Sequence, residues 1–86
     1  MIKHSMQTYS TGREHRLVFT PDAPCDSDAV VCRVYPPGER RAKEFNLDPL
    51  DCSFEFYYQF RNLGDYVMVI AVAGEVTNIL KAVVDR

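Results

Sequence analysis

The side chains that could supply a nucleophile and its base are three cysteines and two histidines, spread along the 86 residues of the chain. A catalytic pair requires the nucleophile to lie within hydrogen-bond reach of its base. No feature of the spacing places His4 or His15 beside Cys25, Cys32 or Cys52. No serine lies in the G-x-S-x-G pattern of a hydrolase elbow. We therefore expect no catalytic residues, and a protein that is not an enzyme.

Metal and cofactor sites are not indicated by the sequence either. Asp22, Asp26 and Asp28 are close together, but the glycine and the final glutamate of a calcium-binding EF-hand loop are missing. The four glycines are too dispersed to form a phosphate-binding loop. Three cysteines without C-x-x-C spacing predict free thiols, with a bridge between Cys25 and Cys32 as the alternative. We expect no cofactor and no metal.

Charge and hydropathy argue against two classes of partner. The formal net charge is −2, and the lysines and arginines are scattered, so no basic face is available for nucleic acid. No apolar run reaches membrane-spanning length, and the first residues lack the apolar segment of a signal peptide. We therefore expect no nucleic-acid partner, no membrane partner, and synthesis in the cytoplasm.

Most of the chain has apolar residues at every second position, which is the period of a β-strand. In the clearest run, 53–61, the two faces differ, one buried and one solvated: Phe54, Phe56, Tyr58 and Phe60 face one way, and Glu55, Tyr57, Gln59 and Arg61 face the other. Six further strands are predicted at 2–9, 13–20, 29–35, 42–47, 66–73 and 76–84. A helix is the alternative for the last of these, although its β-branched residues favour a strand.

Turn residues separate the predicted strands. Examples are Pro36-Pro37-Gly38, where two prolines fix φ and the glycine can adopt a positive φ, and Asp48-Pro49-Leu50-Asp51. Seven short strands with such spacing, and no internal repeat, predict one all-β domain over residues 1–86. We expect a seven-stranded antiparallel sandwich of two sheets, with a small β-barrel as the alternative.

The segment Asn62-Leu63-Gly64-Asp65-Tyr66-Val67-Met68 resembles the D-x-G-x-Y-x-C signature that opens the sixth strand of immunoglobulin domains. Gly64 and Tyr66 match that signature, while Asn62 stands where the family has aspartate. By this resemblance Tyr66 is the corner tyrosine, with a buried ring and a hydroxyl bonded to backbone a few residues upstream. The resemblance therefore implies a structural role for Tyr66 and Gly64.

The chain also departs from antibody-type domains, because it has no tryptophan and has Met68 where the second cysteine would be. It is more similar to the cysteine-free immunoglobulin-like modules of bacteriophage particles. The strand that ends in Val34-Tyr35-Pro36-Pro37-Gly38, the later Gly64-Asp65-Tyr66 and the final apolar strand pair carry this similarity. It implies a virion component, such as a head decoration, connector, tail or baseplate accessory part, that holds larger proteins together.

The last two predicted strands are apolar on both faces, whereas a surface strand usually presents one face to water. Val76 is expected on the core face of the final strand. Val67 and Val69 on one strand, and Ile79 and Val83 on the other, are expected on the opposite face. These four residues predict an exposed apolar patch of the kind that marks contacts. The alternative is that the N-terminal strand or a loop covers them.

Two further features are candidates for contacts with other proteins. Tyr57 lies beside Glu55 and Arg61 on the polar face of its strand, and tyrosine is favoured at protein interfaces. The final strand has only Lys81 and Asp85 to discourage pairing, so its edge is expected to be open to a strand from another chain.

These observations favour a non-enzymatic structural or interaction protein. We expect a bacteriophage structural protein, located in the virion, that assembles through β-sheet faces and edges with larger virion subunits or as a homo-oligomer. The alternative is a small cytoplasmic regulator or inhibitor that binds one host protein.

Overall fold

The computed structural model describes residues 2–19, 30–50 and 53–85, and within these ranges the chain is all-β and has no helix. The strands are β1 (Lys3–Ser10), β2 (Glu14–Phe19), β3 (Val30–Tyr35), β4 (Lys43–Asn46), β5 (Asp48–Leu50), β6 (Ser53–Gln59), β7 (Gly64–Val72) and β8 (Glu75–Asp85). The predicted number of strands is therefore too low by one. The additional strand, β5, forms where a turn was predicted, and its proline is tolerated because β5 lies at the edge of a sheet.

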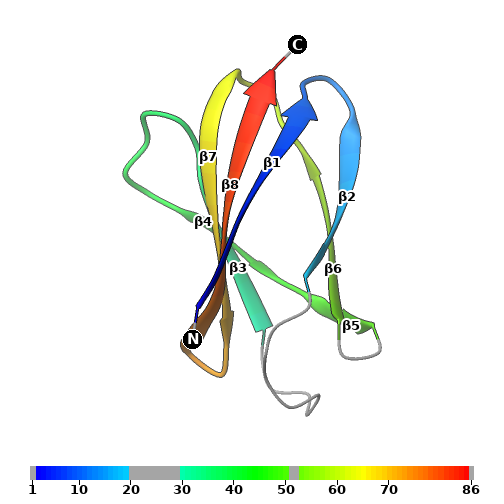
Figure 1. Cartoon of the computed structure of the whole chain (residues 1–86), viewed down its shortest axis with the longest axis vertical. Helices are drawn as coiled ribbons and strands as arrows, with labels where there is room; N and C mark the ends of the chain where they lie inside the picture. The colour runs from blue at the N-terminus through cyan, green and yellow to red at the C-terminus, as the bar shows by residue number, and fades with distance from the viewer. Residues whose placement is uncertain (1, 20–29, 51–52, 86) are drawn as a thin grey trace.

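The strands form two sheets, which Figure 1 shows as two layers. One sheet has the order β1-β8-β7-β3-β4, and the other has the order β2-β6-β5. The described strands of the two sheets do not join, so the arrangement is a sandwich and not a barrel. The coarse prediction of an all-β, two-sheet fold is confirmed.

The position of β1 corrects two predictions. It runs parallel to β8, from Lys3 opposite Asn78 to Ser10 opposite Asp85, whereas all other strand pairs are antiparallel. The sheets are therefore not purely antiparallel. The prediction of an open edge on the final strand is also wrong, because β8 lies between β1 and β7. The free edge on this side of the sheet belongs to β1.

The core lies between the sheets and consists of the inward residues of alternating strands. In β6, Phe54 and Phe56 are buried while Tyr57 is exposed, which confirms the predicted alternation in this strand. The buried core cluster is Leu17, Phe19, Val30, Cys32, Val34, Leu47, Phe54, Phe56, Phe60, Tyr66, Met68, Ile70, Leu80, Ala82 and Val84. In the five-stranded sheet, these residues come from β8, β7 and β3, and none comes from β1 or β4.

A β-bulge changes the alternation near the start of β8. Ile70 pairs with Asn78 and the next residue of β7, Ala71, pairs with Val76, so Thr77 is the extra residue of the bulge. Val76 consequently lies on the outer face of the sheet and is only half-buried, which contradicts its predicted place in the core. The same bulge leaves Asn78 on the inner face, beside Ile70.

The five-stranded sheet is wider than the three-stranded sheet that packs on it. Lys3 to Thr8 of β1 are exposed on both faces of the strand, and Lys43, Glu44 and Asn46 of β4 are exposed as well. The small sheet thus covers the middle of the large one, while β1 and β4 extend beyond it on opposite sides. A hollow lies beneath each of these two overhanging strands.

Candidate functional site

The outer face of the five-stranded sheet holds the four residues of the predicted apolar patch. Val69 of β7 pairs directly with Ile79 of β8, and residues that pair across strands share a face of the sheet. Val67 and Val83 lie on this same face, each two or four residues from that pair along its strand. The register therefore brings all four predicted residues together on one surface.

Exposure shows that this surface is not fully covered by the described chain. Val67 is 38% exposed, and Val69, Ile79 and Val83 are half-buried. Met6 of β1, which pairs with Lys81, adds the most exposed large apolar side chain of the face, at 67%. Sequence reasoning missed Met6 because the pairing of β1 with β8 was not foreseen. The N-terminal strand extends this face and does not cover it, contrary to the alternative considered above.

Charges of both signs are interspersed on this outer face. Lys81 lies between Met6 and Val67 in the register, and its Nζ is 3.4 Å from Oδ2 of Asp65. In the neighbouring row, Arg33 of β3 pairs in register with Glu44 of β4. The face thus combines apolar side chains from β1, β8 and β7 with two positive side chains, Lys81 and Arg33, and three negative ones, Asp65, Glu44 and Asp85, of which Asp85 lies two residues beyond Val83. We call this surface the outer patch: Met6, Val67, Val69, Ile79, Val83, Lys81 and Asp65.

Tyr57 lies on the other side of the molecule, on the outer face of the three-stranded sheet. It is 52% exposed and pairs in register with Arg16. Nη2 of Arg16 donates a hydrogen bond of 2.8 Å to Oε2 of Glu55. Hydrogen bonds from Tyr57 and Arg16 lower the pKa of the Glu55 carboxyl. The structure therefore separates Tyr57 from the outer patch, and the cation paired with Glu55 is Arg16.

The corner residues have the geometry that the sequence predicts. The Tyr66 ring is buried, and its hydroxyl donates to the carbonyl oxygen of Asn62 and accepts from the Asn62 N–H, both at 3.1 Å. Gly64 has φ of 123°, and a Cβ there would lie 3.0 Å from Cγ of Pro37. Glycine is favoured at this position because the backbone has a positive φ and a Cβ would crowd the proline ring.

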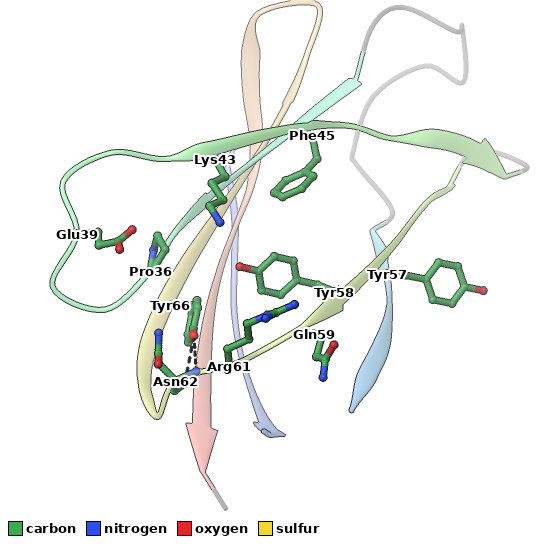
Figure 2. A pocket seen from close by; sticks show the side chains of 10 residues that line it. All are labelled: Pro36, Glu39, Lys43, Phe45, Tyr57, Tyr58, Gln59, Arg61, Asn62 and Tyr66. Carbon is green, nitrogen blue, oxygen red and sulfur yellow. Dashed lines mark hydrogen bonds between the residues drawn. The ribbon is translucent and has the colours of Figure 1, made fainter. Parts of the chain in front are cut away.

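The hollow beneath β4 has aromatic walls and charged side chains at its rim. Figure 2 shows the Tyr58 ring near its centre, between Phe45 above and Arg61 below, with Lys43 directed toward Tyr58 and Tyr57 pointing away. Its volume is about 280 Å³. Burial raises the pKa of the Tyr58 hydroxyl, and the nearby Tyr66 adds to the increase. The two cations suit an anionic group, but Glu39 on the same rim offsets one of them. In the sequence, an indication of this hollow is that strand alternation places the charged Lys43 on the inner face of β4, opposite the buried Val34.

The residues considered above for catalysis occupy structural positions where they are described. His15 donates from Nε2 to the carbonyl oxygen of Ser10 at 2.9 Å and packs edge-on against Tyr9, while His4 is exposed on the outer face. Cys32 is a free, fully buried thiol. Cys25, Cys52 and the aspartates at 22, 26 and 28 lie outside the described residues.

Two further findings concern sites and membranes. In the described ranges, no group of three or more histidine, cysteine, aspartate or glutamate side chains is arranged to hold a metal ion. The same ranges contain no helix that is long and apolar enough to cross a membrane. Comparison of the chain with protein families, with curated proteins and with solved structures found no match.

Proposed function

We propose that the protein is a non-enzymatic, immunoglobulin-like binding module that associates with a second copy of itself through the outer patch. The strand order supports the immunoglobulin-like topology. In variable-type domains, strands G, F, C and C′ are neighbours in one sheet, and B, E and D form the other. Reading β2 to β8 as B, C, C′, D, E, F and G reproduces both orders. The corner bond of Tyr66 supports the same topology.

The observation that carries the binding function is the set of apolar side chains in the outer patch. The directly paired Val69 and Ile79 are flanked by the exposed side chains of Met6 and Val67. Three adjacent strands therefore present apolar side chains, interrupted by Lys81, on a face where a solvated sheet usually carries polar ones. Burying such surface is the main favourable contribution to most protein–protein association.

A second copy is the partner that the charges favour. In a two-fold symmetric contact, the same surface faces itself, so its charges must be self-complementary. The outer face can satisfy this condition, because Lys81 and Arg33 lie on it together with Asp65, Glu44 and Asp85 and can pair with them across a two-fold axis. A strongly charged partner would meet charges of both signs there, two positive and three negative, and therefore no strong opposite charge.

A bacteriophage particle is the setting that we propose for this module. The proposal depends on the resemblance carried by Val34 to Gly38 and by Gly64 to Tyr66, and on the fact that particle components occur in symmetric multiples. In such a particle, self-associated modules would join larger virion subunits by contact alone, without a cofactor.

The test is the solution mass of the protein, measured by light scattering over a range of concentrations. We expect the mass to rise from 9.9 kDa to about twice that value. Val67→Asp should abolish the increase, because it places a charge among the apolar side chains of the outer patch, while the strand is retained because Lys81 lies opposite.

The matched control is Val18→Lys on the outer face of the three-stranded sheet. Val18 is 46% exposed and pairs with Glu55, so this variant also adds one charge opposite a counter-charge. It should dimerise like the wild type. A wild-type monomer at every concentration would overturn self-association and favour the regulator that binds one partner. Loss of the dimer in Val18→Lys or Tyr57→Ala alone would move the contact to the other sheet.

A further inference from the structure

The four edge strands of the sandwich differ in how well they are protected against pairing with other chains. β4 and β5 are short, and they contain Lys43, Glu44 and Pro49, while β2 contains Glu14 and Arg16. Short length, charges and proline are the usual means by which proteins block the pairing of edge strands. β1 spans eight residues, has no proline, and contains no lysine, arginine, aspartate or glutamate after Lys3. Among the described edges, β1 is thus the long one that lacks these protections.

A groove lies along this unprotected strand, between β1 and the edge of β2. It has a volume of about 370 Å³. Ser5 and Gln7 line it from β1, and Leu17, Phe19 and Leu80 contribute apolar side chains from β2 and β8. Figure 1 shows β1 and β2 diverging from the turn that joins them, which separates the two strand edges. No described strand pairs with the outer edge of β1 or of β2.

An unpaired amide lies at the same groove. Asn78 lines it, and its Oδ1 is buried without a hydrogen-bond partner among the described residues. An orphaned buried acceptor costs about 1–3 kcal/mol, so such an atom calls for an explanation. A hydrogen-bond donor that reached this oxygen from the groove would satisfy it.

We infer that an extended strand of another protein adds to the free edge of β1 and places its inward side chains in this groove. The strand would lengthen the five-stranded sheet to six, with main-chain hydrogen bonds to β1. Side chains of alternate residues would point into the groove. Apolar ones would meet Leu17 and Leu80, and one hydrogen-bond donor would satisfy Asn78. This contact is separate from the outer patch, so it does not depend on self-association.

The test uses hydrogen exchange of the β1 amides in the presence of a strand-forming peptide. The probe is a lysine-flanked peptide in which threonine and valine alternate, added at millimolar concentration to the full chain carrying Val67→Asp, which removes dimerisation through the outer patch. The β1 amides that point away from β8, toward the free edge, should exchange up to about tenfold more slowly, while the exchange of the β4 amides should not change. The same peptide with N-methyl groups on alternate backbone nitrogens should give no protection.

A pair of variants distinguishes the groove from a nonspecific edge effect. Ser5→Lys places a charge on the inner face of β1 and should remove the protection, because inward-pointing charges block strand addition. Thr8→Lys is the control, since Thr8 pairs with Val83 and lies on the outer face of the same strand. Absence of β1 protection, equal protection by the N-methylated peptide, or equal loss in both variants would each overturn the inference. Pairing of β1 with a second copy would instead show as protection that rises with protein concentration without peptide.

Discussion

The two overhanging sides of the five-stranded sheet differ in the side chains that their outermost strands, β4 and β1, direct inward. On the β4 side, the inward ring of Phe45 packs against Phe56 at 5.1 Å and against Tyr58 at 5.9 Å, measured between ring centroids. On the β1 side, the inward residues Ser5 and Gln7 are polar and exposed. We call the β4 side the sealed side, because aromatic rings pack on the inner face of β4 above its hollow, and the β1 side the open side, because the inward residues there are polar.

This difference shows that sheet width alone does not determine where a sandwich is open. Both sides have the same cause, a five-stranded sheet on a three-stranded one, and each has a hollow beneath its outermost strand. The chemistry of the inward residues decides the outcome, because only an apolar side chain gains free energy by filling the space between the layers. The open side is thus encoded in β1, where Tyr9 is the first inward residue that packs on the core.

The largest effect expected on the sealed side concerns the thiol of Cys32, the cross-strand partner of Phe45. Cys32 pairs with Phe45 in the β3–β4 register and is fully buried, and burial raises its pKa from 9.0 to about 12. The unfolded chain loses the thiol proton from about pH 9, and the folded chain keeps it to about pH 12. Stabilisation is therefore complete below pH 9 and is lost as the pH rises toward 12. The total loss is on the order of 4 kcal/mol.

Urea denaturation of the wild type and of Cys32→Ala at about pH 8 and about pH 11 measures this effect. The wild type should lose more stability than the variant over this interval, because other groups titrate equally in both. Parallel losses would show that water already reaches the thiol on the β4 side, and the contrast between the two sides would fail.

A smaller effect compares one inward residue from each overhanging strand. Phe45→Ala should lower the free energy of unfolding by about 2 kcal/mol, since a half-buried ring that packs on two others is removed. Gln7→Ala should change it by less than about 0.5 kcal/mol, because this side chain is exposed. Chemical denaturation measures both, and equal effects would contradict the distinction between sealed and open sides. Phe45→Ala should also make Cys32 reactive toward a thiol reagent.

The alternation of residue types predicted which side chains face the core. It correctly placed Phe54, Phe56 and Met68 inside and Val67 outside, because a period of two is fixed by strand geometry. It also located the outer patch, apart from Met6. The corner at Tyr66 was predicted from a short motif, since the positive φ of its glycine and the tyrosine hydroxyl bond are local features.

The alternation could not predict which strand lies beside which. The pairing of β1 with β8 joins residues more than seventy positions apart in the sequence, and no local pattern encodes it. The strand β5 was missed because aspartate and proline are turn residues, and pairing with β6 outweighs that preference. The inward position of Asn78 follows from the bulge at Thr77, which a strict alternation cannot produce. The groove beneath β1 depends on all such long-range features and had no signal in the sequence.

The smallest expected effect isolates the unpaired amide of the open side. Asn78→Leu should raise the free energy of unfolding, because it removes a buried acceptor that has no partner among the described residues. Leucine also has the higher strand propensity, and Asn46→Leu on the exposed face of β4 measures that contribution separately. The gain at position 78 should exceed the gain at 46 by about 1 kcal/mol. Thermal and urea denaturation of the two variants give this difference.

The same pair of variants also tests what the open side is for. If a donor from an added strand forms a hydrogen bond with Oδ1 of Asn78, Asn78→Leu should stabilise the free protein and weaken the peptide's protection of the β1 amides. Asn46→Leu should leave that protection intact. An asparagine with a purely structural role would give the opposite result at 78, a loss of stability. A gain in stability with unchanged peptide protection would show that Oδ1 of Asn78 is unpaired because of the bulge and does not bind the added strand. The strand would then bind β1 through main-chain hydrogen bonds alone.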